Sequence, residues 1–225
     1  MKDLLFQTVE GELGFTTAGY LAFILLIAAF IVAAVLLTKK TKDEASTKKF
    51  DTKQLVFCAV SVALAMVTSM IPLYSFPFGG SVTLFSMFFI CFIGYLYGPS
   101  AGICTGFAYG LLQLVIKPYI YFPLQVLVDY PLAFGALGLS GFFWKKKNGL
   151  LKGYVAGILG RYVFSVLSGW LFFGQYAWEG WNPLPYALAY NGAYIFTEAA
   201  ITILLLLLVK PLKNGLSYIK RMTQE

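Results

Sequence analysis

The chain has 225 residues, of which 59% are hydrophobic and 12% are charged, and its formal net charge at pH 7 is +7. Soluble domains carry about 25% charged residues, so this composition excludes a soluble globular protein and predicts an integral membrane protein. The sequence contains no histidine, and its cysteines stand singly at Cys58, Cys91 and Cys104, which predicts neither a metal site nor a disulfide framework.

Apolar runs of membrane-spanning length follow one another along the chain and predict an all-α membrane protein. They cover residues 17–38, 54–72, 81–97, 100–116, 123–143, 151–173 and 185–209. The first run is set apart by the polar, charged segment 39–53 (KKTKDEASTKKFDTK), which has the composition of a linker. We therefore expect one lone N-terminal transmembrane helix at 17–38, then a compact six-helix membrane unit at 54–210.

The distribution of lysine and arginine predicts the orientation of these helices. The linker 39–53, the loop at 145–152 and the tail 211–225 are rich in these residues, whereas the opposite side carries Lys2 and Lys117. Positive loops remain on the cytoplasmic side, so residues 1–16 are expected outside and residues 211–225 in the cytoplasm of a plasma membrane. This topology explains the positive net charge without a nucleic-acid partner.

Three ionisable residues, Asp129, Arg161 and Glu198, fall inside the predicted six-helix unit. Each costs about 2.5–3.5 kcal/mol at the centre of a membrane helix, so each is expected to face protein or a cavity. Arg161 and Glu198 lie at similar depths and are candidates for an ion pair. Asp129, nearer the outer surface, is then left without a partner, and a monocationic ligand entering from outside would balance it. Pro131 has no N–H and is expected to kink this helix. The alternative is that tyrosine hydroxyls or backbone groups near this kink hold the carboxylate, which needs no ligand.

An aromatic segment at 172–194 would lie at the outer surface above Asp129. Its tyrosine and tryptophan residues are typical of a membrane-interface belt, but aromatic faces also bind flat heteroaromatic cations. Asn191 is harder to explain by a belt, because it falls inside the last helix on the same face as Glu198. Ser165 and Ser168 share a face with Arg161 in the same way, so both faces are expected to point into the bundle.

Several stretches together resemble one family, the thiamine-specific substrate-binding component of bacterial energy-coupling-factor transporters. They are GGSVTLFSM (79–87), PLQVLVDYPLAF (123–134), GRYVFSVLSGWLFFG (160–174), QYAWEGW (175–181) and YALAYNGAY (186–194). The resemblance covers about residues 54–209 and implies a six-helix bundle that binds the vitamin near its outer surface. The helix at 17–38 is an addition to that pattern.

The resemblance also implies a substrate site, and Gln125 completes our prediction of it. The family's acid falls on Asp129, which would pair with the thiazolium cation, and Tyr130, Tyr186 and Phe173 would pack on the rings. Asn191 and Ser165 would hydrogen-bond the aminopyrimidine, and Gln125, in the same apolar run as Asp129, is included in the site. The chain departs from some relatives, which have tryptophan at the position of Phe173, histidine at that of Ser165 and tryptophan near Gly80.

The family's partners follow from the same resemblance. Ala59 and Ala63 match an alanine pair that docks against a membrane-embedded coupling subunit, although small residues four apart are also typical of ordinary helix packing. The chain contains no G-x-x-x-x-G-K-[ST] motif, so two separate cytoplasmic ATPase subunits would supply the energy. No cofactor is predicted.

Three alternatives remain. A related precursor such as hydroxymethylpyrimidine is neutral and would leave Asp129 without a cation. An intramembrane enzyme would need paired acids, a metal site or a nucleophile with a base, which this sequence does not offer. A purely structural membrane scaffold would leave an acid and an amide beneath an aromatic loop unexplained.

Overall fold

A computed structural model describes residues 6–9, 12–15, 21 and 51–223. The predicted transmembrane helix at 17–38 and nearly all of the linker at 39–53 lie outside these described residues. Within the N-terminal segment, β1 (Phe6–Val9) and β2 (Glu12–Phe15) pair as an antiparallel hairpin.

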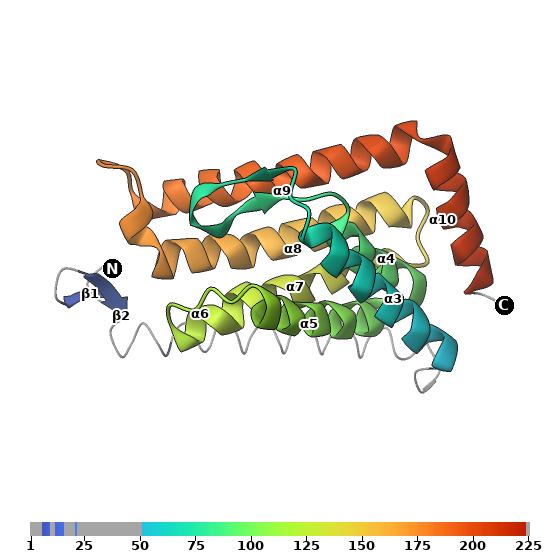
Figure 1. The fold of residues 1–225 in the computed structure, drawn as a ribbon, viewed down its shortest axis with the longest axis horizontal. Coiled ribbons are helices and arrows are strands. Elements are labelled where there is room, and N and C mark those ends of the chain that lie inside the picture. The colour runs from blue at the N-terminus through green and yellow to red at the C-terminus, as the bar shows by residue number, and fades with distance from the viewer. Residues whose placement is uncertain (1–5, 10–11, 16–20, 22–50, 224–225) are drawn as a thin grey trace.

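The rest of the described chain is a helical membrane bundle (Figure 1). Its long helices are α3 (Thr52–Ser69), α5 (Pro99–Ile116), α8 (Gly149–Phe172) and α9 (Pro183–Leu208). A fifth apolar stretch, Leu124–Phe143, is helical but irregular, and all five are long and apolar enough to cross a membrane. The chain is therefore a multi-pass, all-α membrane protein, as its composition predicted.

Helix α4 (Ser86–Tyr97) is the exception, because it has only 12 residues. At a rise of 1.5 Å per residue it is about 18 Å long, too short to cross the hydrocarbon core alone. Our prediction of a continuous span from 81 to 97 was wrong at its start. There the chain instead forms a hairpin of β3 (Tyr74–Ser75), η1 (Pro77–Gly79) and β4 (Ser81–Val82).

Left-handed backbone conformations shape this hairpin. Phe78, at its tip, has φ 63°, and Phe85, which precedes α4, has φ 65°. Such conformations are uncommon for residues other than glycine and end regular structure on either side. They explain why an apolar run that reads as one helix is divided into a hairpin and a short helix.

The irregular fifth segment consists of four short pieces. They are α6 (Pro123–Leu127), the π-turn η2 (Val128–Leu132), α7 (Ala133–Gly135) and the 3-10 helix η3 (Ala136–Phe143). Pro131 has no N–H to donate to the preceding turn, and this widens the helix locally. The predicted irregularity at this proline is confirmed, and Asp129 lies inside the π-turn.

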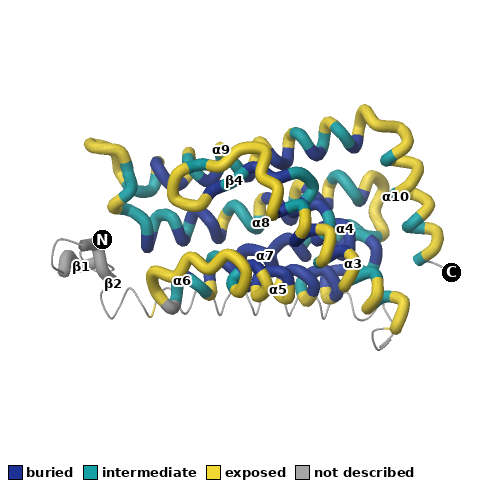
Figure 2. Tube along the Cα trace, in the orientation of Figure 1, coloured by how far each residue is buried: buried dark blue, intermediate teal, exposed yellow. Residues whose placement is uncertain are grey.

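Glycines bring three of these elements into backbone contact. A Cβ atom added at Gly102 of α5 would lie 2.8 Å from Cα of Gly94 and 2.9 Å from Cα of Gly138. Small residues allow such approaches between helices in lipid. Helices α4 and α5 and segment η3 are therefore packed closely around a core that includes Phe88, Tyr109 and other buried residues (Figure 2).

The two ends of the bundle differ. At one end, α10 (Lys210–Met222) turns away from α9 and lies across the bundle, near the start of α3 (Figure 1). The predicted tail 211–225 is thus largely helical. At the other end lie the start of α6 and the turn η4 (Gly174–Tyr176). Tyr176 of this turn lines the cavity of the candidate site.

Candidate functional site

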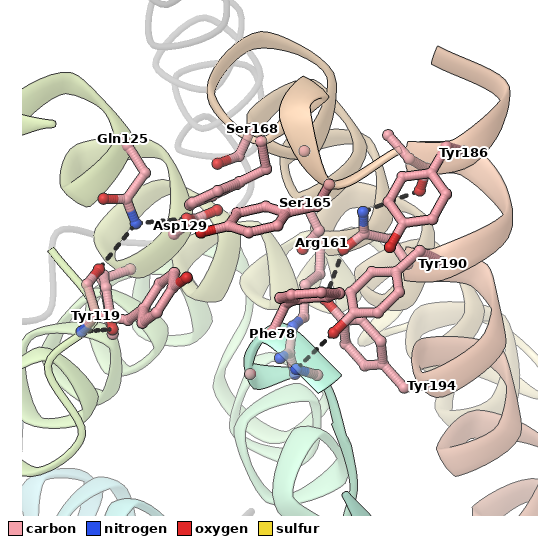
Figure 3. A pocket seen from close by; sticks show the side chains of 18 residues that line it. Phe78, Tyr119, Gln125, Asp129, Arg161, Ser165, Ser168, Tyr186, Tyr190 and Tyr194 are labelled. Carbon is pink, nitrogen blue, oxygen red and sulfur yellow. Dashed lines mark hydrogen bonds between the residues drawn. The ribbon is translucent and has the colours of Figure 1, made fainter. Parts of the chain in front are cut away.

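A cavity of about 170 Å³ lies between the β3–β4 hairpin, the π-turn, α8 and α9 (Figure 3). All the residues of the predicted substrate site line it, although they come from three separate stretches of the sequence. They are Gln125, Asp129, Tyr130, Ser165, Phe173, Tyr186 and Asn191.

The carboxylate of Asp129 is held on one wall of the cavity. Gln125 Nε2 donates to Asp129 Oδ2 at 2.7 Å and also to the carbonyl of Tyr119 at 3.0 Å, while Gln125 Oε1 accepts from the amide of Tyr121. The amide nitrogen and oxygen of the buried Gln125 are therefore both engaged in hydrogen bonds within the protein. Gln125 fixes the direction of the carboxylate, and this makes it a positioning residue in our reading of the site.

Helix α8 contributes two buried hydroxyls beside this carboxylate. Ser165 and Ser168 both line the cavity, one turn apart on the same helix face. Ser168 Oγ is buried and has no hydrogen-bond partner among the described residues. An unsatisfied buried hydroxyl is costly, so this atom is available to a polar group inside the cavity.

Helix α9 forms the opposite wall. Asn191 is buried, donates through Nδ2 to the carbonyl of Ala187 at 2.9 Å and accepts at Oδ1 from the hydroxyl of Tyr194 at 2.7 Å. Its amide nitrogen has a second hydrogen, which remains free to meet a ligand acceptor. Figure 3 shows Tyr186, Tyr190 and Tyr194 on this side, across the cavity from Asp129.

Aromatic rings make up much of the remaining surface. Phe78 stacks on Tyr176 with ring centroids 4.4 Å apart and planes at 30°, and Tyr176 in turn stacks on Phe173 at 6.2 Å. Tyr186 and Tyr190 are stacked at 5.8 Å with planes at 21°. Parallel aromatic faces of this kind accept flat rings and attract cations.

Hydrogen bonds to Tyr190 hold the hairpin over the cavity. The hydroxyl of Tyr190 accepts from the amide of Gly80 at 2.9 Å and donates to the carbonyl of Pro77. A Cβ atom at Gly80 would lie 2.7 Å from that hydroxyl oxygen, so the close approach requires glycine.

Tyr130 contributes its ring, whereas its hydroxyl is already engaged. The hydroxyl donates to the carbonyl of Lys117 at 2.9 Å and accepts from the amide of Tyr119 at 2.8 Å. Tyr130 therefore also holds the loop that brings Tyr119 to the cavity.

The expected ion pair between Arg161 and Glu198 is not formed. Glu198 is buried and accepts hydrogen bonds from Thr83 Oγ1 at 2.6 Å, from Ser86 Oγ at 2.8 Å, and from the amides of Thr83 and Met87, both at 3.2 Å. Neutral donors at the start of α4 thus satisfy this carboxylate. Arg161 instead lies over the ring of Phe134, 4.4 Å from its centroid, and lines the cavity.

These contacts change the reason why Asp129 lacks a charged partner. Asp129 and Arg161 both line the cavity, but no ion pair joins them within the described part of the chain. Asp129 is left with Gln125 as its hydrogen-bond donor. The cavity therefore presents an unpaired carboxylate, although for a different reason from the one expected.

Sequence reasoning did not include several lining residues in the site. They are Phe78, Gly79, Gly80, Tyr119, Arg161, Ser168, Gly169, Tyr176, Ala187, Tyr190 and Tyr194. The serine pattern on α8 could have identified Ser168. No sequence pattern identified Tyr119 as a site residue, because it reaches the cavity only through the fold of the loop before α6.

The predicted contact residues Ala59 and Ala63 lie elsewhere. Both are exposed on α3 and line a shallow apolar groove of about 610 Å³ between α3 and α5. Leu112, on the other side of this groove, is also exposed. The alanine pair therefore faces outward and is accessible to another protein.

Comparison with known proteins gives a consistent family. A family model described as "Thiamine transporter protein" matches residues 55–216. The thiamine transporter ThiT of Bacillus subtilis is 36% identical over 173 residues, which are 69% of this chain and 88% of that protein. ThiT of Lacticaseibacillus paracasei is 30% identical over 138 residues, 51% of this chain and 69% of that protein. A solved structure of ThiT from Listeria monocytogenes has a TM-score of 0.60 and 30% identity, covering 70% of this chain and 94% of that one.

Proposed function

This chain belongs to the thiamine transporter protein family, a family of transporters rather than enzymes, and from that premise we propose that its cavity binds thiamine. The observation that carries the proposal is the meeting of an unpaired carboxylate, stacked aromatic rings and an asparagine amide in one cavity. Thiamine combines a permanent thiazolium cation with an aromatic aminopyrimidine, so each feature has a counterpart in the ligand.

The residues divide between the two rings of the ligand. Asp129 faces the thiazolium, and the rings of Phe173, Tyr130 and Tyr186 pack on the flat faces of the ligand. Asn191 and the hydroxyls of Ser165 and Ser168 hydrogen-bond polar edges, because the free hydrogen of Asn191 and the unpartnered Ser168 Oγ are otherwise unused.

Calorimetric titration of the purified full chain tests this function. Thiamine is expected to bind with a stoichiometry of one, and neutral hydroxymethylpyrimidine is expected to bind more weakly, because it lacks the cation. Equal or tighter binding of hydroxymethylpyrimidine would overturn the assignment in favour of the neutral precursor.

We further propose that transport is driven by two cytoplasmic ATPase subunits through a membrane-embedded coupling subunit. The sequence has no phosphate-binding motif of its own, so hydrolysis has to occur on another chain. The exposed groove at Ala59 and Ala63 is the proposed contact, because small side chains allow a partner helix to approach closely.

Bulky substitutions test the contact. Ala59→Trp and Ala63→Trp should abolish co-purification with the coupling subunit and leave thiamine affinity unchanged, since the cavity lies elsewhere. Ala200→Trp, on the exposed face of α9, is the matched control and should retain the complex. Loss of the complex in all three variants, or in none, would contradict this contact.

The lysine distribution supports an orientation in which the cavity opens outside and α10 lies in the cytoplasm. Membrane-impermeant thiol labelling of intact cells tests it. Ala177→Cys in the aromatic loop should be labelled and Lys146→Cys should not, and the reverse result would invert the topology.

A further inference from the structure

Helix α10 presents a basic face and an apolar face. Leu212, Leu216 and Ile219 are half-buried and pack against the core of the bundle. At its end, Lys220 donates to Tyr95 Oη at 2.7 Å, and the carbonyl of Met222 accepts from Lys53 Nζ. The helix is thus fixed across the end of the bundle, as Figure 1 shows.

A second cavity lies beneath this helix, at the opposite end of the bundle from the candidate site. It has a volume of about 500 Å³ and is bounded by α10, the start of α8 and the end of α9. Its polar lining is Asn148, Lys213, Ser217, Lys220 and Arg221. Spacings of three, four and seven residues place Lys213, Ser217 and Lys220 on the same face of α10.

The charge of this cavity is uniformly positive. Three cationic side chains line it, from Lys213, Lys220 and Arg221, and no acidic residue of the described chain does. The cavity also meets the first residues of α8, where the amides at the start of a helix favour an anion. Together these groups fit a phosphate.

The other part of the lining is apolar. Leu150, Leu151, Leu206, Leu207 and Leu216 line the cavity. Leu207 is 58% exposed, and the next residue, Leu208, is 75% exposed, so apolar surface continues from the cavity along the outside of α9. A ligand held here would need both an anionic group and a hydrocarbon chain.

We propose that this cavity binds an anionic phospholipid, with its phosphate among the cations of α10 and an acyl chain along the end of α9. The cavity lies at an end of the membrane-crossing helices, where lipid headgroups lie, and basic pockets between such helices bind headgroups. Ser217, Lys220 and Arg221 lie beyond the family match, which ends at residue 216.

Binding of phosphatidylglycerol and phosphatidylcholine to the detergent-solubilised full chain can be measured by native mass spectrometry. We expect phosphatidylglycerol to be retained about tenfold more tightly than phosphatidylcholine. The double variant Lys213→Gln/Arg221→Gln should bind phosphatidylglycerol about tenfold more weakly than the wild type does. It keeps the hydrogen bond from Lys220 to Tyr95. Millimolar glycerol 3-phosphate should not displace the lipid.

Lys147→Gln/Lys152→Gln is the matched control, because these exposed lysines flank the cavity without lining it. This control double variant should change the affinity for phosphatidylglycerol by less than twofold. Equal loss in both double variants would show diffuse surface attraction and overturn the site. Displacement by glycerol 3-phosphate would overturn the lipid in favour of a soluble phosphate, and equal retention of the two lipids would overturn the headgroup selectivity.

A second pair of variants keeps the test independent of the lysine substitutions. Ser217→Glu places a carboxylate in the cavity at an exposed helix position, whereas Ser217→Gln adds a similar volume without charge. Phosphatidylglycerol binding should fall in the first variant and persist in the second. Persistence in both would contradict the proposal.

Discussion

The carboxylates of Glu198 and Asp129, both within the bundle, are stabilised in different ways. Glu198 accepts from hydroxyls and amides of Thr83, Ser86 and Met87, so its charge is satisfied within the protein. Asp129 accepts from Gln125, lies beside the hydroxyl of Ser168, and otherwise faces the cavity. The first carboxylate therefore has a structural role, and the second is available to a ligand.

Glu198→Gln should destabilise the protein. The amide replaces one acceptor oxygen with a donor, which then faces the hydroxyl and amide donors around Thr83 and Ser86. Leaving such groups unsatisfied costs about 1–3 kcal/mol, so the melting temperature in detergent should fall by several degrees. Glu179→Gln, in an exposed loop, is the control, and equal melting temperatures of the two variants would refute the structural role.

The partner of Glu198 could not be predicted from its depth. Residue spacing gives the height of a side chain along its helix axis, and it placed Arg161 and Glu198 at similar heights. It does not say which distant segment faces the side chain, and the donors at Thr83 and Ser86 are more than one hundred residues away in the sequence. Asp129 was easier to identify, because an acid in an apolar run is anomalous without any knowledge of its neighbours.

Two elements of the fold shape the candidate site, the β3–β4 hairpin and the π-turn of the fifth segment. The hairpin lies over the cavity and is held to α9 by the hydroxyl of Tyr190. The π-turn widens the fifth segment at Pro131 and carries Asp129. Sequence reasoning identified the proline and its effect, but it extended α4 into the hairpin because both are apolar.

Tyr190→Phe should speed the release of thiamine, because it removes the hydroxyl that bonds Gly80 and Pro77 while keeping the aromatic ring. We expect the dissociation rate, measured by stopped-flow fluorescence, to rise about threefold to tenfold, which corresponds to a net loss of about 1 kcal/mol for the two hydrogen bonds together. Tyr162→Phe removes a comparable bond to the carbonyl of Leu188, outside the cavity, and should leave the rate unchanged. An unchanged rate in Tyr190→Phe would show that the hairpin does not control release.

Gly138→Ala should disrupt the packing of η3 against α5. The added methyl group would overlap backbone atoms of Gly102 and Ile103, which cannot move as a flexible side chain can. Overpacking of this kind costs about 1–3 kcal/mol or more, so thermal stability should fall sharply. Gly215→Ala, where nothing lies within 4 Å in exposed helix α10, should be neutral or slightly stabilising, and equal effects of the two variants would contradict this account.

At the scale of the whole molecule, composition and hydropathy were sufficient for the class of protein and for most of its helices. The predicted spans at 100–116, 151–173 and 185–209 agree with α5, α8 and α9 within a few residues. The cavity, by contrast, brings together side chains from four stretches that span more than one hundred residues, and helix periodicity does not define such long-range contacts. The resemblance to a family supplied that information for six of the seven predicted site residues, all but Gln125.

The molecule as a whole places two cavities of different charge at opposite ends of one bundle. The cavity at the hairpin end is lined by Asp129 and Arg161, whereas the cavity under α10 is lined by cations without an acidic residue among its described lining. On the proposed orientation, the first faces incoming vitamin and the second faces the cytoplasmic lipid surface. The central claim is that the carboxylate of Asp129 pairs with the thiamine cation.

Calorimetric titration of thiamine against Asp129→Asn tests this claim most directly, with Glu179→Gln as a control that removes a nearby acid outside the cavity. A charge-assisted contact is about twice as strong as a neutral one, so the asparagine variant should bind thiamine at least about tenfold more weakly at unchanged thermal stability. The control should bind like the wild type. An Asp129→Asn protein with wild-type affinity for thiamine would contradict the account.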